Sequence, residues 1–335
     1  MMTISIYDEA LERIGTLETW ISLIWDEEYG GEGRFQLEVW ATSEAVRKLR
    51  EDVFCGLKGS KTLAVIKSVV AKDKKLVYSG TMAVGLFKDR TSTRRVFEEN
   101  AENAMRGIVG EMAEYPPIAL GESAWIEDVF LPEIRDMTVL EYLRQISAET
   151  DIGFRLSHDK AAKKLLFECY KPEENPNARY ATAYGNLGDI QYSKSTADYK
   201  NVAVIVNTYS ETKDEVTTEN RITLYAGATE TTGAERREMM VTLSKRPEKD
   251  EAQEDFEARL IAEGEAKLIE AVMIENITFE VSDDRAQLGD LITVLLPEIG
   301  AKMQTRVIGV MITSQKNKTT REISVGTPIL LGKRG

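Results

Sequence analysis

The last quarter of the chain, residues 251–326, constrains the fold more than any other stretch. It starts with a helical pattern, in which Phe256, Leu260 and Leu268 recur on one face among many Glu and Lys residues. Alternation of apolar and polar residues then predicts further strands over residues 273–281, 291–295, 305–313 and 321–325. A charged helix followed by short alternating strands indicates a small β-barrel-like scaffold that carries a helix and packs against other protein.

The first 90 residues predict a second β-rich domain. Phe35, Leu37 and Val39 alternate with polar residues after a turn formed by Gly30-Gly31-Glu32-Gly33, which indicates an antiparallel strand pair. Residues 20–25 are apolar on both faces, as in a strand buried on two sides. Shorter apolar runs predict strands over residues 4–8, 63–70, 76–78 and 80–87, with a short helix over residues 43–50.

Between these ends, residues 91–185 change from strand to helix periodicity. One amphipathic helix is predicted over residues 94–112, and a second opens at Thr138 with Glu141 as its capping-box partner. We expect Gly153 to end that second helix in the left-handed conformation. A hairpin around His158-Asp159-Lys160 follows, and residues 172–177 form the expected boundary loop. Beyond it, a meander of strands is predicted over residues 190–192, 201–209, 215–225 and 238–243.

The predicted fold class is therefore α+β and mainly β. Two β-barrel-like domains flank a small α+β domain, with limits at residues 1–90, 91–185 and 186–335. The last domain contains the inserted helix at about residues 250–272. The two β-rich ends could be distant copies of one fold.

The charge balance argues against some partners. The chain of 335 residues carries 43 basic and 56 acidic residues, a net charge of −13. This disfavours sequence-specific nucleic-acid binding and anionic membrane surfaces, both of which draw on clustered Lys and Arg. The N-terminal residues lack the pattern of a signal peptide, and no apolar run approaches the ~20 residues of a membrane helix. We expect a soluble protein that is made in the cytoplasm and does not insert into membranes.

Residues with catalytic or metal-binding chemistry are few. His158 is the sole histidine, and its predicted place in a turn favours a solvated side chain. Cys55 and Cys169 stand far apart, without a second cysteine at metal or redox spacing, which favours two half-buried thiols. We therefore predict no metal site and no cofactor.

The carboxylate clusters were the other possible source of chemistry. Asp26-Glu27-Glu28, Glu98-Glu99 and Asp283-Asp284 are predicted to lie in polar turns or on helix surfaces, where a solvated face is the simplest interpretation. The Gly30–Gly33 turn lacks the Lys-Ser/Thr of a phosphate loop. We predict no catalytic residue and no enzymatic activity, with a hydrolase that uses paired carboxylates as the remote alternative.

The four tryptophans offer a possible ligand surface. Trp20, Trp25, Trp40 and Trp125 could line a carbohydrate groove. All but Trp125 lie within strand-like alternation, where large rings usually fill the core. Core packing is therefore the favoured interpretation for three of the four.

Taken together, three segments resemble the tail-hub (tail-associated, baseplate hub) proteins of siphophages and prophages. The first is residues 20–40, which contain Gly33-Arg34-Phe35-Gln36-Leu37. The second is residues 138–170, which contain Asp151-Ile152-Gly153-Phe154. The third is the charged helix with the strands that follow it, including Leu288-Gly289-Asp290-Leu291-Ile292-Thr293-Val294, Arg306-Val307-Ile308-Gly309-Val310 and Ile323-Ser324-Val325-Gly326. The segments span nearly the whole chain in the expected order.

The resemblance implies a structural protein of the virion tail tip or of a prophage-encoded tail-like particle. It implies a homotrimeric ring that closes or extends the tail tube, with two β domains per subunit matching the sixfold tube. The implied partners are the distal tail, tape measure and tail tube proteins, and DNA would pass through the lumen. Because the sequence ends at Gly335 directly after the last predicted strands, the short form without an enzymatic extension is expected. The main alternative is a carbohydrate-binding adhesion module of the same particle.

Overall fold

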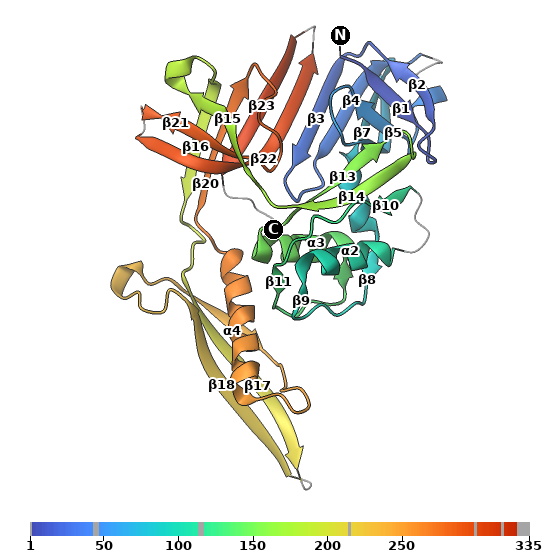
Figure 1. Ribbon diagram of the computed structural model, residues 1–335. Coiled ribbons are helices and arrows are strands. Elements are labelled where there is room, and N and C mark those ends of the chain that lie inside the picture. Colours follow the sequence, from blue (N-terminus) through green and yellow to red (C-terminus); the bar gives the residue numbers. More distant parts are fainter. Residues whose placement is uncertain are drawn as a thin grey trace.

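The computed structural model describes residues 2–42, 47–112, 117–213, 216–297, 300–315 and 318–326. Two β-rich parts lie side by side at one end of the molecule, a helical unit lies beneath them, and a long arm projects away from both (Figure 1). Residues 43–46, the first half of the helix expected over residues 43–50, fall outside the described residues. The predicted mainly β, α+β fold class is confirmed.

The N-terminal part is an antiparallel arrangement of strands. They are β1 (Ile4–Tyr7), β2 (Arg13–Leu17), β3 (Ser22–Glu28), β4 (Arg34–Trp40), β5 (Phe54–Leu57), β6 (Ala64–Lys72) and β7 (Lys75–Met82). Strand β4 buries Phe35, Leu37 and Val39, as its alternation predicts. Gly33 closes the β3–β4 turn at φ +56°, where a Cβ atom would lie 2.3 Å from the carbonyl oxygen of Asp26. This turn therefore requires glycine.

The helical unit combines two helices with short strands. Its elements are η1 (Ala83–Asp89), β8 (Thr91–Ser92), β9 (Glu99–Asn100), α2 (Ala101–Gly110), β10 (Ile118–Leu120), β11 (Val129–Phe130), β12 (Met137–Thr138), α3 (Val139–Thr150), β13 (Gly153–Asp159) and β14 (Lys164–Tyr170). The predicted capping box is confirmed, since Thr138 Oγ1 accepts from the Glu141 amide and the Glu141 carboxylate accepts from the Thr138 amide.

Two local predictions in this unit are wrong. The first helix begins at Ala101 and not at Arg94, because Val96 forms a bridge with Ile134 and Asn100 caps the helix through the Asn103 amide. The left-handed residue after α3 is Asp151 (φ +59°), not Gly153. Gly153 is needed for a different reason: a Cβ atom there would lie 2.5 Å from the Tyr170 ring.

The C-terminal part holds the remaining strands of the body. They are β15 (Glu174–Ala181), β16 (Gly188–Ser195), β20 (Ile274–Val281), β21 (Leu291–Leu296), β22 (Ala301–Gln315) and β23 (Lys318–Gly326), with η2 (Thr182–Tyr184) between the first two. Strand β15 begins within the stretch expected to be a boundary loop and pairs in parallel with β21.

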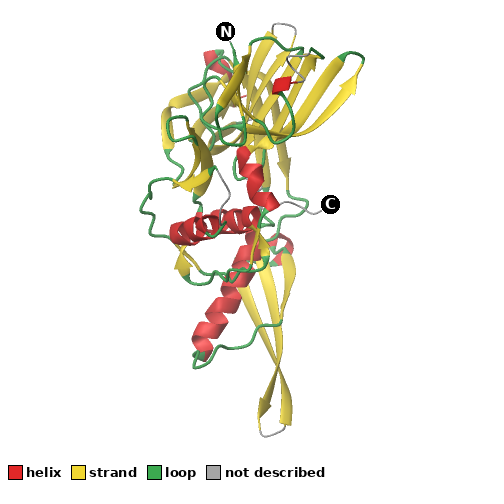
Figure 2. Ribbon diagram, turned by 90° about the vertical axis from the view of Figure 1, so that its right-hand side faces the viewer, coloured by secondary structure: helices red, strands yellow, loops and turns green. Residues whose placement is uncertain are grey.

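The arm is inserted between β16 and β20. It consists of β17 (Val202–Lys213), β18 (Val216–Gly227), η3 (Gly233–Glu235), β19 (Glu238–Leu243) and α4 (Gln253–Ile269). Helix α4 packs on β17 and β18, and Figure 2 shows the hairpin extending beyond it. The buried residues of this contact include Ile205, Phe256 and Leu260. The helix expected near residues 250–272 therefore covers the arm's own three-stranded sheet.

One sheet runs through both β-rich parts. Strand β22 pairs with β3 from Gly309 opposite Glu28 to Gln315 opposite Ser22, and this joins the parts into a 13-stranded sheet. Its main path runs β16-β20-β23-β22-β3-β4-β7-β6-β5-β1-β2. Within the described ranges no strand pairing closes either part into a barrel, so the barrel form stays a prediction.

Within the described ranges, buried apolar residues form four clusters. Two belong to the N-terminal and C-terminal β-rich parts and one to the arm. The fourth lies in the helical unit and also takes in Tyr7, Phe54 and Val65 of the N-terminal part, which share this cluster with residues such as Met105 and Phe167. The domain limits predicted from the sequence stay predictions. The packing itself ties the helical unit to the N-terminal part.

Candidate assembly surfaces

An acidic row crosses the solvent-facing side of the shared sheet. Asp26 on β3 lies opposite Met311 on β22, Met311 lies opposite Glu322 on β23, and Glu322 lies opposite Glu280 on β20. Paired residues of antiparallel strands point to the same face, so these side chains share one side of the sheet. The opposite side carries buried residues such as Trp25. The row therefore links both β-rich parts across their junction.

Like charges in this row raise one another's proton affinity. Burial raises the pKa of Glu322, and the charges of Glu280 and Asp189 raise it further. Burial also raises the pKa of Asp26, although Arg34 at 3.8 Å lowers it in part. Directly opposed like charges destabilise a sheet. Glu280 and Glu322 are directly opposed in this way and therefore weaken the sheet slightly, whereas Asp26 lies opposite Met311 and Arg34.

The sequence placed these acids differently. Asp26-Glu27-Glu28 was expected in a turn, but all three lie on β3. The sequence analysis did not single out Glu280 and Glu322. The alternation on β20 and β23 carries the signal, since Glu280 lies between two buried residues and Glu322 directly precedes the buried Ile323. The pairing of those strands brings together residues that are far apart in the sequence, so the local pattern does not predict it.

The other acidic pairs have structural partners. Burial alone would raise the pKa of Asp283, but its ion pair with Arg285 at 2.6 Å lowers it, and Tyr180 Oη donates to it at 2.9 Å. Glu99 pairs with Arg94 at 2.6 Å. These contacts account for Asp283 and Glu99 without catalysis.

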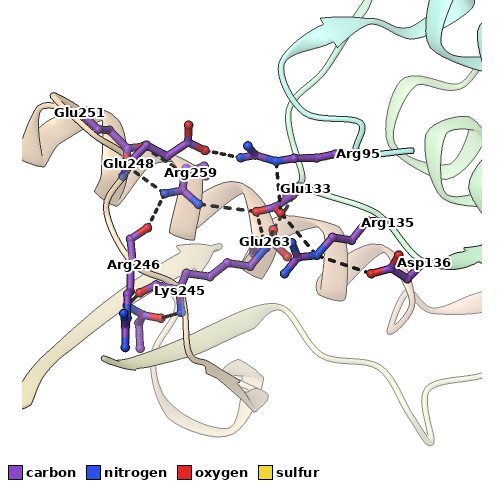
Figure 3. A network of polar contacts seen from close by, with 11 residues as sticks. Arg95, Glu133, Arg135, Asp136, Lys245, Arg246, Glu248, Glu251, Arg259 and Glu263 are labelled. Atoms are coloured by element: carbon purple, nitrogen blue, oxygen red, sulfur yellow. Dashed lines mark hydrogen bonds and ion pairs between the residues drawn. The ribbon is translucent and has the colours of Figure 1, made fainter. Parts of the chain in front are cut away.

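A network of charged residues joins the arm to the helical unit (Figure 3). At its centre Glu133, whose side chain is 9% exposed, accepts from Lys245 Nζ at 3.0 Å and lies 3.7 Å from Arg259 and 3.3 Å from Arg95. Arg259 also pairs with Glu251 at 2.9 Å. Burial alone would raise the pKa of Glu133, but the hydrogen bond and charge of Lys245 lower it. The network therefore fixes the root of the arm.

A second polar junction ties the C-terminal part to the helical unit. Arg306 on β22 forms a double contact with the Asp151 carboxylate, at 2.5 and 2.7 Å. Its guanidinium also lies 4.8 Å from the ring centroid of Tyr29 in the β3–β4 turn. Paired, planar contacts of this kind fix orientation as well as adding energy. All three parts of the body meet at this arginine.

The tryptophans divide between core and surface. Trp25 is fully buried, as predicted, and Trp20 is half-buried. The core prediction is wrong for Trp40, which ends β4 and is 58% exposed, because it lies at the rim of the sheet with Lys75 above its ring. Trp125 is 86% exposed.

His158 is not a solvated turn residue. It lies near the end of β13, where its ring contacts Tyr7 edge-on at 4.7 Å between centroids, and burial lowers its pKa. Cys55 and Cys169 are both buried, and burial raises the pKa of each thiol to about 12. Neither cysteine is poised as a nucleophile.

Over the residues that the structure describes, no group of three or more His, Cys, Asp or Glu side chains could hold a metal ion. Of the helices in that same portion, none combines the length and the apolar character that a bilayer span requires. The absence of a metal site stays a prediction for the chain as a whole.

Comparison with solved structures defines the fold. The tail protein from Neisseria meningitidis MC58 is similar with a TM-score of 0.64 and 13% identity over 98% of this chain and 99% of that one. The 43 kDa tail protein of prophage MuSo2 from Shewanella oneidensis gives 0.63 and 10% over 99% of each chain. Prophage tail protein gp18 from Listeria monocytogenes EGD-e gives 0.58 and 11% over 100% of this chain and 96% of that one. The fold is that of phage and prophage tail proteins.

The family follows from the sequence. Residues 133–327 match the model of the Siphovirus ReqiPepy6 Gp37-like protein family, which covers more than half of the chain. The chain therefore belongs to this family, and the predicted resemblance to siphophage and prophage tail proteins is confirmed. No curated protein matches the sequence.

Proposed function

We propose that this chain is a structural hub protein at the tail tip or baseplate of a phage or prophage-encoded particle, where three copies form a ring that closes or extends the tail tube. The observation that carries the proposal is the sheet shared by both β-rich parts through β3 and β22. Each copy thereby presents two β-rich parts as one wall. Three copies supply six such parts, which suits a sixfold tube.

Ring closure needs two different faces that fit each other. The main path of the shared sheet ends at β2 on one side and at β16 on the other. Strand β16 is almost wholly exposed. Unpaired strand edges readily take a strand from another molecule, so these two ends are suited to contact between neighbouring copies. Mild dissociation of tails that carry the tagged chain, followed by native mass spectrometry, should release a three-copy species. A sixfold species would contradict the ring as proposed.

The acidic row supports a conduit role for the exposed face of the sheet. Negative side chains along a lumen repel the phosphate backbone and let DNA slide without binding. Changing Glu280 and Glu322 together to Gln should slow DNA ejection from assembled particles. The matched control changes Glu254 and Asp255 on the arm helix to Gln and Asn. It removes the same amount of negative charge at a position away from the shared sheet. Unchanged ejection in the Glu280/Glu322 variant would count against the conduit.

The proposal assigns the chain no catalytic activity. It acts by assembly with the distal tail, tape measure and tail tube proteins, after synthesis in the bacterial cytoplasm. The carbohydrate-binding alternative has no support from the family or from the similar structures. Turnover of peptidoglycan by the purified chain would contradict the assignment of a purely structural role.

A further inference from the structure

The arm is joined to the rest of the molecule by two chain segments. They are residues 196–201, between β16 and β17, and residues 270–273, between α4 and β20 (Figure 1). The two segments lie side by side, since the Lys200 amide donates to the Ala271 carbonyl oxygen at 2.9 Å. Together they form one narrow connection. Such a connection can act as a hinge, because changes in a few backbone angles there turn the whole arm.

The arm has a core of its own. Its buried apolar cluster is built from β17, β18, β19 and α4 and includes Ile205, Phe256 and Leu260. Among the residues that the structure describes, none of the other three clusters contains a residue of the arm. Turning the arm as a rigid body therefore leaves all four clusters intact. The free energy that opposes such a turn comes from the contact between the arm and the helical unit.

That contact is built on charged side chains (Figure 3). Glu133 of the helical unit accepts from Lys245 Nζ at 3.0 Å and lies 3.7 Å from Arg259, both on the arm. Arg95 of the helical unit pairs with Glu248 of the arm, and both side chains are 44% exposed. An ion pair that is exposed to this extent adds little stability and weakens further in salt.

Each side of the contact also supplies its own opposite charges. The pairs within one side are Glu133 with Arg95 at 3.3 Å in the helical unit and, on the arm, Lys245 with Glu263 and Arg259 with Glu251, both at 2.9 Å. Separation of the two sides therefore leaves Glu133, Lys245 and Arg259 paired. Opening avoids the large cost of a buried charge without a partner.

A gap remains between α3 and α4 next to the network. It measures about 290 Å³, and its lining includes Gln145 and Glu149 of α3 and Ala266 and Ile269 of α4. Burial raises the pKa of Glu149, and the like charge of Glu265 on α4 raises it further. Unfilled space forfeits dispersion contacts, and like charges repel. Both features weaken the docking of α4 on the helical unit.

We propose that the arm is a hinged element. It turns about residues 196–201 and 270–273 between a docked position, which the charged network fixes, and a released position in which the two sides of the network separate. Salt shifts the balance toward release, because it screens the partly exposed charges. The arm can thus change direction while the shared sheet keeps its shape. The inference concerns a single copy of the chain and does not depend on ring formation.

Distances between two spin labels test the hinge. The full chain carries Glu122→Cys on the helical unit and Glu219→Cys on β18, both at exposed positions, and its natural cysteines are buried. Double electron–electron resonance should show one distance population at about 10 mM salt and a second at about 1 M, as the Debye length falls from about 30 Å to about 3 Å. The ratio of released to docked arms should rise at least ~5-fold.

Two variants should shift this ratio in opposite directions. Glu133→Gln removes the acid that is shared across the contact, so it should raise the released fraction at every salt concentration. Glu149→Gln removes the like charge that faces Glu265, so it should lower the released fraction. The matched control is Glu111→Gln, whose partner Arg94 lies in the same unit at 2.7 Å. It should leave the distances unchanged.

Two results would overturn the hinge. A single distance population that changes neither with salt nor in Glu133→Gln would show that the arm is a rigid extension of the body. A broad distribution already at low salt would show that the arm has no docked position. The proposed function would survive either result, because it is judged by copy number and position in the particle.

Discussion

The charged network at the root of the arm gives the sharpest prediction of stability. Glu133→Gln keeps the shape of the side chain but removes the charge that Arg95, Lys245 and Arg259 share. Breaking a buried ion pair from one side costs roughly 3–5 kcal/mol, whereas an exposed pair contributes about 0–1 kcal/mol. Lys245 retains Glu263 at 2.9 Å, and Arg259 retains Glu251. We therefore expect an intermediate loss of about 2 kcal/mol in docking of the arm.

Hydrogen exchange measures this loss locally. The Glu133 amide donates to Glu263 Oε1 at 3.1 Å, so it reports on the docked state. A loss of about 2 kcal/mol corresponds to roughly 30-fold faster exchange. We expect this acceleration in residues 131–136 and 245–251, with the arm's own sheet unaffected because its core is separate.

The matched control is Glu111→Gln, since Glu111 pairs with Arg94 at 2.7 Å through a side chain that is half exposed. It should change exchange by less than about fivefold, as for a surface pair worth under 1 kcal/mol. If Glu133→Gln behaved like this control, the network would not be what holds the arm, and the reasoning from burial and shared charge would be wrong.

Three further predictions concern pH, the shared sheet and the β13–β14 hairpin. The pKa values of Glu133 and Glu251 are lowered in the folded protein. The network should therefore be complete above pH 4.5 and lost as the pH falls through the lowered values. Hydrogen exchange at the root of the arm that is already accelerated near neutral pH, beyond the intrinsic pH dependence of exchange, would contradict this. Glu322→Gln should increase the free energy of unfolding, measured by urea denaturation, by at most about 0.5 kcal/mol, because it relieves repulsion on a largely solvated face. A clear destabilisation would count against the acidic row. Gly153→Ala should lower the free energy of unfolding by about 1–3 kcal/mol, measured by thermal unfolding, because the added Cβ clashes with the Tyr170 ring. The control Gly110→Ala, whose Cβ would meet only Leu120 at 3.7 Å, should be neutral or stabilising. Equal effects of the two changes would refute the steric argument.

Local patterns predicted much of this fold. The alternation of Phe35, Leu37 and Val39 and the capping box of Thr138 and Glu141 are each set by neighbours in the sequence. The same holds for the hairpin of β13 and β14. Such features follow from side-chain periodicity and backbone donors that must be satisfied nearby.

Features set by distant contacts were missed. The start of α2 depends on the bridge of Val96 with Ile134, and the role of Gly153 depends on Tyr170. The exposure of Trp40 depends on its place at the rim of the sheet. The acidic row exists only because β3, β22, β23 and β20 lie side by side. No single stretch of sequence contains that order.

The central claim is that the two β-rich parts of each copy form the wall of a threefold ring on the tail axis. An electron cryomicroscopy reconstruction of the particle tests it most directly. We predict three copies around the axis at the distal end of the tube, with Asp26, Glu280 and Glu322 facing the lumen. Density for this chain only on the outside of the particle, or with its acidic row turned outward, would contradict the claim.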